Sequence, residues 1–167
     1  MVPLVSGFVK CTLFWICAIS FTIYNHVVTE YLFYHPLEIR YADIDAQGHL
    51  NNAKFLTFFE QARIQYLRHL GLFREGTSFM EIGVILADIH VAFRAPVLWG
   101  MDVRVGVATI HLGNKSMKVA QCLKNGIDGP IMAEGEVVLV TYDYHSGATL
   151  PLPPNWREAI KSFENIS

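Results

Sequence analysis

The chain has 167 residues, of which 52% are hydrophobic, so its length allows one domain with a buried apolar core. Thirteen Lys and Arg against fifteen Asp and Glu give a formal charge of −2, without the long basic runs typical of nucleic-acid-binding proteins. Cys11, Cys17 and Cys122 lack CxxC spacing, which argues against a disulfide framework or a zinc knuckle and favours a reducing compartment.

The first feature along the chain is an apolar run from Cys11 to Tyr24 that contains no charged residue. Three interpretations are open. The run could be an untranslated upstream region, with the protein starting at a valine codon near Val28. Extended to Val28, it also reaches the lower length limit of a membrane anchor. The third interpretation is a secretory signal, which Lys10 before the run would suit, or a buried helix. No clear cleavage site follows the run. We therefore separate an N-terminal extension, 1–30, from a domain over 31–167, and expect membrane contact only through residues 1–28.

The domain is expected to begin with one strand and one helix. The strand is predicted over Tyr34 to Tyr41, and the glycine and asparagines that follow favour a loop. Apolar residues then recur at intervals of three and four, which predicts a helix that begins at Asn51 or Asn52 and ends at Gly71. These residues are Phe55, Phe59, Ala62, Tyr66 and Leu70.

Four further strands are predicted after the helix, separated by turn-like residues. Their ranges are Ile82 to Phe93, Met101 to Ile110, Lys115 to Leu123, and Ile131 to Tyr142. Val103, Val105 and Val107 alternate with polar or small residues, as a strand with one buried face requires. A short polar helix is expected from about Asn155. One long helix and an antiparallel sheet of about five strands make an α+β protein, an architecture that by itself names no function.

A more specific signal is the segment Arg40 to Arg63, RYADIDAQGHLNNAKFLTFFEQAR. It contains an Asp-x-Asp pair, a Gly-His-hydrophobic-Asn-Asn loop, and a Glu-x-Ala-Arg motif on the predicted helix. With these motifs the chain resembles the 4-hydroxybenzoyl-CoA thioesterase family of hotdog proteins. The resemblance continues through residues 93–97, 112–116 and 133–135.

The resemblance implies a hotdog fold, in which a sheet wraps around one long helix. It also implies a homodimer whose two sheets join, often assembled further into a homotetramer, with active sites at the subunit interface. The expected enzyme is a cytoplasmic acyl-CoA thioesterase that releases free acid and CoA without a cofactor or a metal. Retention of the apolar N-terminal segment would instead anchor it to a membrane.

The family assigns catalysis to the position that Asp45 occupies, as general base or nucleophile, and carbonyl polarisation to the backbone amide at Asn52. Thioester hydrolysis needs such a carboxylate and such donors for the developing oxyanion. Some relatives have a histidine or tyrosine at the position of Asn52. An asparagine side chain cannot transfer a proton, so this chain lacks a second acid or base there. His49 either assists Asp45 or is a hydrogen-bonded part of the loop, and Asp43 is either functional or a structural partner of Arg40.

Five further residues are substrate-binding candidates. Glu60 and Phe55 would face the acyl group. The simpler alternatives are that Glu60 is a solvated surface charge and that Phe55 is an ordinary core residue. Asn114, Lys115 and Ser116 suit CoA phosphates or the pantetheine arm, and an ordinary surface turn is the competing reading. The histidines have no metal-ligand spacing, and no Gly-x-Ser-x-Gly motif is present. A hotdog protein that binds acyl-CoA or acyl-carrier thioesters without hydrolysing them is the alternative function, and a hotdog dehydratase is disfavoured.

Overall fold

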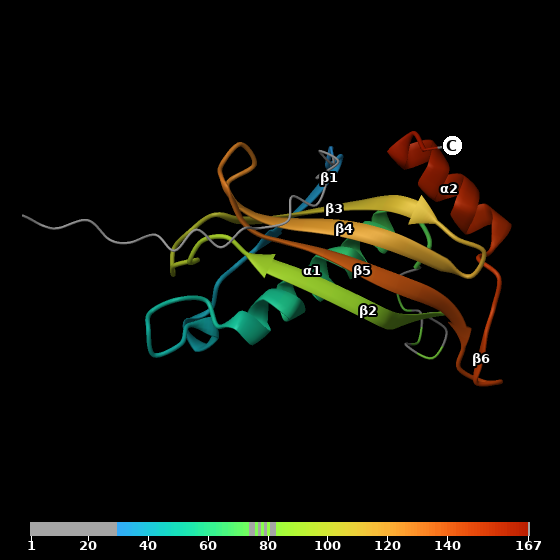
Figure 1. Ribbon diagram of the computed structural model, residues 1–167, viewed down its shortest axis with the longest axis horizontal. Coiled ribbons are helices and arrows are strands. Elements are labelled where there is room, and N and C mark those ends of the chain that lie inside the picture. The colour runs from blue at the N-terminus through green and yellow to red at the C-terminus, as the bar shows by residue number, and fades with distance from the viewer. Residues whose placement is uncertain (1–29, 74–75, 77, 79, 81–82, 167) are drawn as a thin grey trace, which may run out of the picture.

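The computed structural model of the protein describes residues 30–73, 76, 78, 80 and 83–166, and the interpretations of residues 1–29 lie outside this part of the chain. The elements appear in the order strand, short 3-10 helix, long helix, five strands, helix (Figure 1). They are β1 (Phe33–Leu37), η1 (Tyr41–Asp43), α1 (Asn52–His69), β2 (Val84–Phe93), β3 (Val103–Leu112), β4 (Ser116–Asn125), β5 (Ile131–Asp143), β6 (Ala148–Thr149) and α2 (Pro154–Glu164). None of the helices in the described ranges combines the length and apolar character that crossing a bilayer requires.

The strands form one antiparallel sheet in the order β1-β3-β4-β5-β2, and the short β6 pairs with the end of β5. β2 therefore does not pair with β3, its neighbour in sequence. The chain crosses from β2, at one edge, to the middle of the sheet, so β1 and β2 form the two edges (Figure 1). The expected α+β arrangement is confirmed, with β6 as an additional strand.

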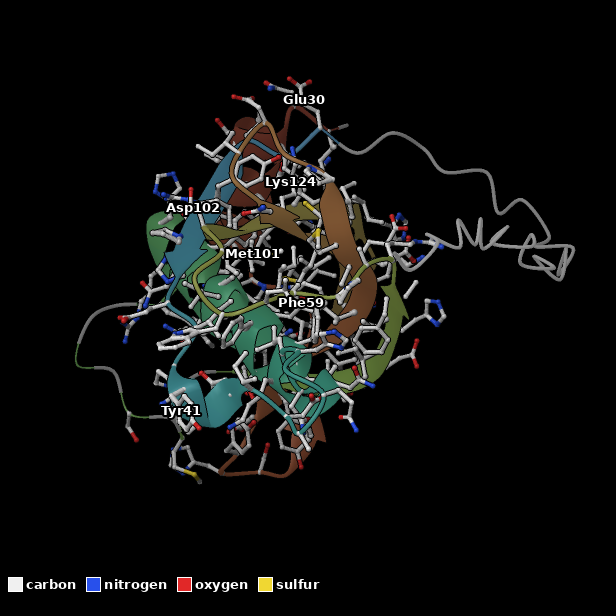
Figure 2. The ribbon with its side chains drawn as sticks, turned by 90° about the vertical axis from the view of Figure 1, so that its left-hand side faces the viewer. Glu30, Tyr41, Phe59, Met101, Asp102 and Lys124 are labelled. Carbon is white, nitrogen blue, oxygen red and sulfur yellow. The ribbon has the colours of Figure 1, made fainter. Side chains whose placement is uncertain are left out.

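The core lies between α1 and one face of this sheet. Phe59, Tyr66 and Leu67 of α1 are fully buried, and Figure 2 shows Phe59 inside the layer between helix and sheet. The alternating valines of β3 are also buried, as the sequence pattern predicted. The side chain of Asn51 accepts the backbone N–H of Ala53 at 2.9 Å and caps the start of α1.

On the opposite face of the sheet, Tyr31 and Tyr34 pack around Gly106. A Cβ atom on Gly106 would lie 2.9 Å from both Cγ of Tyr31 and Sγ of Cys122. Glycine at this position thus lets Tyr31 pack directly on β3. Burial raises the pKa of the Cys122 thiol to about 11, which makes this free cysteine a packing group.

Several details differ from the sequence predictions. β1 ends at Leu37 and not at Tyr41, because the carboxylate of Asp43 accepts the backbone N–H of Arg40 at 3.0 Å and turns the chain into η1. β3 continues through Leu112, two residues beyond the predicted end. The predicted short polar helix is the amphipathic α2, whose residue Ile160 is fully buried. The predicted start of β2 at Ile82 lies outside the described residues.

Candidate active site

A cavity of about 390 Å³ opens where three segments meet: the loop after η1, the N-terminus of α1, and the residues that follow β2. Its walls combine polar side chains from the loop with apolar groups from the helix and from β2. The lining residues are Asp45, Gln47, His49, Leu50, Asn52, Phe55, Phe93, Arg94, Ala95, Pro96 and Val97. All three catalytic candidates therefore reach the same cavity, together with Phe55 from the substrate-binding set.

Asp45 is half-buried and held in a defined orientation by its own loop. One carboxylate oxygen, Oδ1, accepts the backbone N–H of Gln47 at 2.9 Å and that of His49 at 3.2 Å. Within the described part of the chain, the second oxygen has no hydrogen-bond donor. This geometry fixes the side chain through Oδ1 and leaves Oδ2 available for a proton or for attack on a carbon.

The loop around Asp45 is braced by main-chain hydrogen bonds. The Asp45 N–H donates to the carbonyl of His49 at 2.8 Å, which closes the turn. The Leu50 N–H donates to the carbonyl of Val97 at 2.7 Å, and His49 forms an isolated bridge with Leu98. The segment after β2 thus fixes the loop around Asp45 from outside.

Asn52 is the first residue of α1, and its backbone amide points out of the helix end. Neighbouring amides are satisfied, since Asn51 donates to the carbonyl of Asp43 and Ala53 donates to the Asn51 side chain, both at 2.9 Å. Among the described residues, no acceptor faces the Asn52 amide. An unpaired N–H at the positive end of a helix is suited to a developing oxyanion.

Asp43 has a different environment from Asp45. It is fully buried and binds the Arg40 guanidinium through both oxygens, at 3.0 and 3.1 Å, with Lys54 Nζ at 3.4 Å. Hydrogen bonding to Arg40 lowers the pKa of Asp43 to about 2. Its carboxylate is thus occupied by structural partners and does not line the cavity.

His49 and Phe55 face the cavity in different ways. The hydrogen bond from His49 to Asp45 comes from the backbone, and His49 also lines the cavity. Phe55 is buried and meets Phe93 edge-on, with ring centroids 5.0 Å apart. Phe55 is therefore both a core residue and part of the apolar wall.

Arg94 is a lining residue to which the sequence analysis gave no role. It follows β2 directly, and its guanidinium forms an ion pair with Glu134. It lies inside the 93–97 motif that carries part of the family resemblance, so the sequence contained the signal. Only the fold shows that this cation reaches the cavity of Asp45.

The remaining candidates lie away from this cavity in a single chain. Glu60 is exposed on α1 and does not line the cavity. Asn114, Lys115 and Ser116 form the β3–β4 turn, which lies beside β6 and α2 at the opposite end of the sheet from the N-terminus of α1 (Figure 1). Lys115 Nζ binds the carbonyl and the hydroxyl of Thr149 at 3.2 and 3.0 Å.

Comparison with known proteins decides the family. The family model described as "Thioesterase-like superfamily" matches residues 39–160. The chain belongs to the thioesterase-like superfamily. The family's hotdog fold and its class, thioester hydrolase, are thereby confirmed for this thioesterase.

Individual relatives agree with this assignment. A thioesterase from Thermus thermophilus, solved in complex with coenzyme A and Zn, is 32% identical, with a TM-score of 0.70 over 80% of this chain and 95% of its own. The long-chain acyl-CoA thioesterase FadM of Escherichia coli K12 is 24% identical over 75% of this chain and 94% of its own. The acyl-CoA thioester hydrolase YbgC of Escherichia coli O6:H1 is 24% identical over 67% of this chain and 83% of its own. In the described residues of the present chain, no group of three or more His, Cys, Asp or Glu is arranged to hold a metal.

Proposed function

We propose that this thioesterase hydrolyses acyl-CoA to free acid and CoA, with Asp45 as its central carboxylate. The observation that carries the proposal is the pairing of two groups in one cavity. Asp45 is fixed through Oδ1 with its other oxygen open, and Asn52 presents an unpaired helix-terminal amide beside it. These are the base and the oxyanion donor that acyl transfer to water needs.

In the proposed reaction, the thioester carbonyl oxygen accepts the Asn52 N–H. Asp45 takes a proton from a water molecule as the water oxygen bonds to the carbonyl carbon. The resulting oxyanion is stabilised by the same amide and by the helix N-terminus. Collapse of this intermediate breaks the carbon–sulfur bond, and the CoA sulfur leaves as a thiolate that is reprotonated. Direct attack by Asp45, through an anhydride that water then hydrolyses, is the covalent variant of this mechanism.

Substrate binding is proposed to require a second copy of the chain. Among the described residues, β2 is an edge strand that pairs only with β5, and it exposes Ile85 and Leu86. An exposed apolar edge invites pairing with another chain, and two-fold symmetric pairing of β2 with its copy would join the two sheets. We therefore infer a homodimer, from which a homotetramer can assemble.

This dimer would also explain how the β3–β4 turn, which is far from the Asp45 cavity of its own chain, could bind CoA. In antiparallel pairing, the Phe93 end of one β2 lies beside the Val84 end of the other. The turn lies at the Val84 end of its own sheet, because Val84 pairs with Thr141 and Ser116 pairs with Val140. The turn of one copy thus comes to the same end of the joined sheet as the Asp45 cavity of the other, which supports the CoA-binding role of Asn114, Lys115 and Ser116.

The acyl group is proposed to lie along Phe55 and Phe93, with Glu60 approaching it only across the dimer. FadM, a relative matched over 94% of its own length, is named for long-chain acyl-CoA, which favours a long acyl chain here. We place the enzyme in the cytoplasm, where the free thiol of Cys122 suits a reducing environment.

A protein that binds acyl-CoA without hydrolysing it is the alternative function. The test is a panel of acyl-CoA esters of increasing chain length, with thiol release and equilibrium binding measured for each. Turnover at catalytic enzyme concentration supports the hydrolase. Tight binding of every ester without thiol release would establish the binding protein instead.

A further inference from the structure

An exposed aromatic patch lies beside the candidate active site. Tyr41, on η1, is 80% exposed, and Trp99, after β2, is 65% exposed. Their ring centroids are 6.0 Å apart and the rings meet edge to face. Leu98, which is 42% exposed, completes what we call the aromatic patch: Tyr41, Leu98 and Trp99. Figure 2 shows Tyr41 at the periphery of the molecule.

The two rings pack on each other and not on the core, so most of their apolar area remains in water. The segments that carry them are well ordered by hydrogen bonds. The N–H of Asp43 donates to the carbonyl of Arg40 at 2.9 Å, and the N–H of Met101 donates to that of Leu98 at 3.3 Å. The patch is thus presented by two braced turns, and its exposure indicates a binding surface.

We propose that the aromatic patch binds the lipid–water interface of an anionic bilayer. Tyr and Trp combine an apolar ring with one polar group, and they are the residues that concentrate at this interface. Arg40, adjacent to Tyr41, keeps 66% of its side chain exposed although it binds Asp43. The Arg40 guanidinium therefore remains accessible to an anionic headgroup beside the aromatic patch.

The size of the patch argues for lipid over a second protein. A stable protein interface buries about 800 Å² on each partner, and three side chains supply only a fraction of that area. A lipid surface has no such minimum, because each inserted ring contributes separately to partitioning. The patch is also built on turns, without a long groove or strand edge that would receive a peptide.

Lipid binding here would place the Asp45 cavity at the membrane. Leu98 pairs with His49 through a β-bridge, and Val97 lines the cavity. The aromatic patch and the cavity wall therefore share one segment. A substrate with a long apolar tail could then pass from the bilayer into the cavity. This consequence rests on the proposed function, whereas lipid binding itself does not.

The test uses the full chain with Trp15→Phe and Trp156→Phe, which leaves Trp99 as its single tryptophan. Vesicles of phosphatidylglycerol and phosphatidylcholine, with and without brominated acyl chains, are added while emission is recorded. We expect the Trp99 emission to move to shorter wavelength and the brominated lipid to quench it. Tyr41→Ser should weaken partitioning at least about threefold, as loss of one partly inserted ring requires. The matched control Leu150→Ser, 46% exposed after β6 at the opposite end of the sheet, should leave partitioning unchanged.

Three other outcomes would overturn the proposal. Absence of vesicle binding would do so directly. Vesicle binding without quenching of Trp99 would assign the lipid contact to another part of the chain. A short-wavelength emission already present without vesicles would show that the patch is covered, by a second copy if the emission depends on protein concentration and by the chain itself if it does not. None of these measurements uses hydrolysis, so they separate lipid binding from the proposed activity.

Discussion

The carboxylate of Asp45 accepts the backbone N–H of His49 at 3.2 Å, so His49 orients the acid through its main chain. Any residue at position 49 that keeps the loop conformation can make this bond. The contact separates two roles that sequence alone leaves together: the carboxylate has the proposed chemical role, and the backbone of His49 holds it in place.

Asp45→Asn should lower kcat at least about a hundredfold, the low end of the contribution of a general base or nucleophile, while the Kd for acyl-CoA changes little. The matched control is Asp143→Asn, because Asp143 caps a turn in the same way, accepting the His145 N–H at 2.9 Å, but does so near β6. His49→Ala should cost less than Asp45→Asn. Near-normal turnover of Asp45→Asn would refute the proposed mechanism.

Arg40→Ala should make the free energy of unfolding depend less on pH in the acid range. Asp43 has a pKa of about 2 in the folded chain, below its ordinary value of 3.8, so the unfolded chain binds more protons between these values. The stabilisation by Asp43 is therefore complete above about pH 4 and is lost as the pH falls toward 2. Unfolding free energies measured across this window should fall less steeply in Arg40→Ala. Arg104→Ala, which breaks the more exposed pair with Asp102, should leave the slope unchanged.

Tyr66→Phe should lower the unfolding free energy by about 1–3 kcal/mol, the cost of leaving buried polar groups without a partner. The Tyr66 hydroxyl donates to Glu164 of α2 and lies 2.9 Å from the hydroxyl of Thr109 on β3. Burial raises the pKa of Glu164, and losing a donor should raise it further. Tyr144→Phe, which loses one half-buried bond to the Val84 carbonyl, is the control and should cost less in the same urea titration.

Lys115→Ala should raise KM for acyl-CoA and leave kcat at saturation nearly unchanged, because a phosphate contact is made equally in the ground and transition states. Within the described part of the chain, Lys115 binds only neutral oxygens of Thr149, so its charge is available. Lys118→Ala, which removes a cation already paired with Glu136, is the control. An equal loss with a truncated pantetheine thioester would exclude the turn from the CoA site.

Leu86→Lys should convert the protein to a monomer and reduce its activity, because a charge on β2 would disrupt pairing of the two edges. Ile131→Lys is the matched control, since Ile131 is similarly exposed but begins β5, which lies inside the sheet. Light scattering measures the mass, and thiol release measures the activity. A dimer of normal mass in Leu86→Lys would show that β2 is not the interface.

The sequence by itself determined the parts of this protein that depend on neighbours along the chain. Helical spacing identified α1, alternation identified the buried face of β3, and the loop motif brought Asp45, His49 and Asn52 together. These predictions succeeded because a short segment sets its own periodicity, and the three residues are separated by only a few peptide units. The loop residues therefore lie close together in any fold that retains the turn.

Only the tertiary structure decided what depends on distant contacts. The strand order put β2 at an edge, brought Arg94 into the cavity, and carried the β3–β4 turn to the opposite end of the sheet. It also paired Arg94 with Glu134, a residue far along the chain. Strand order and ion pairing follow from the free energy of packing segments that are remote in sequence, and no local pattern encodes that quantity.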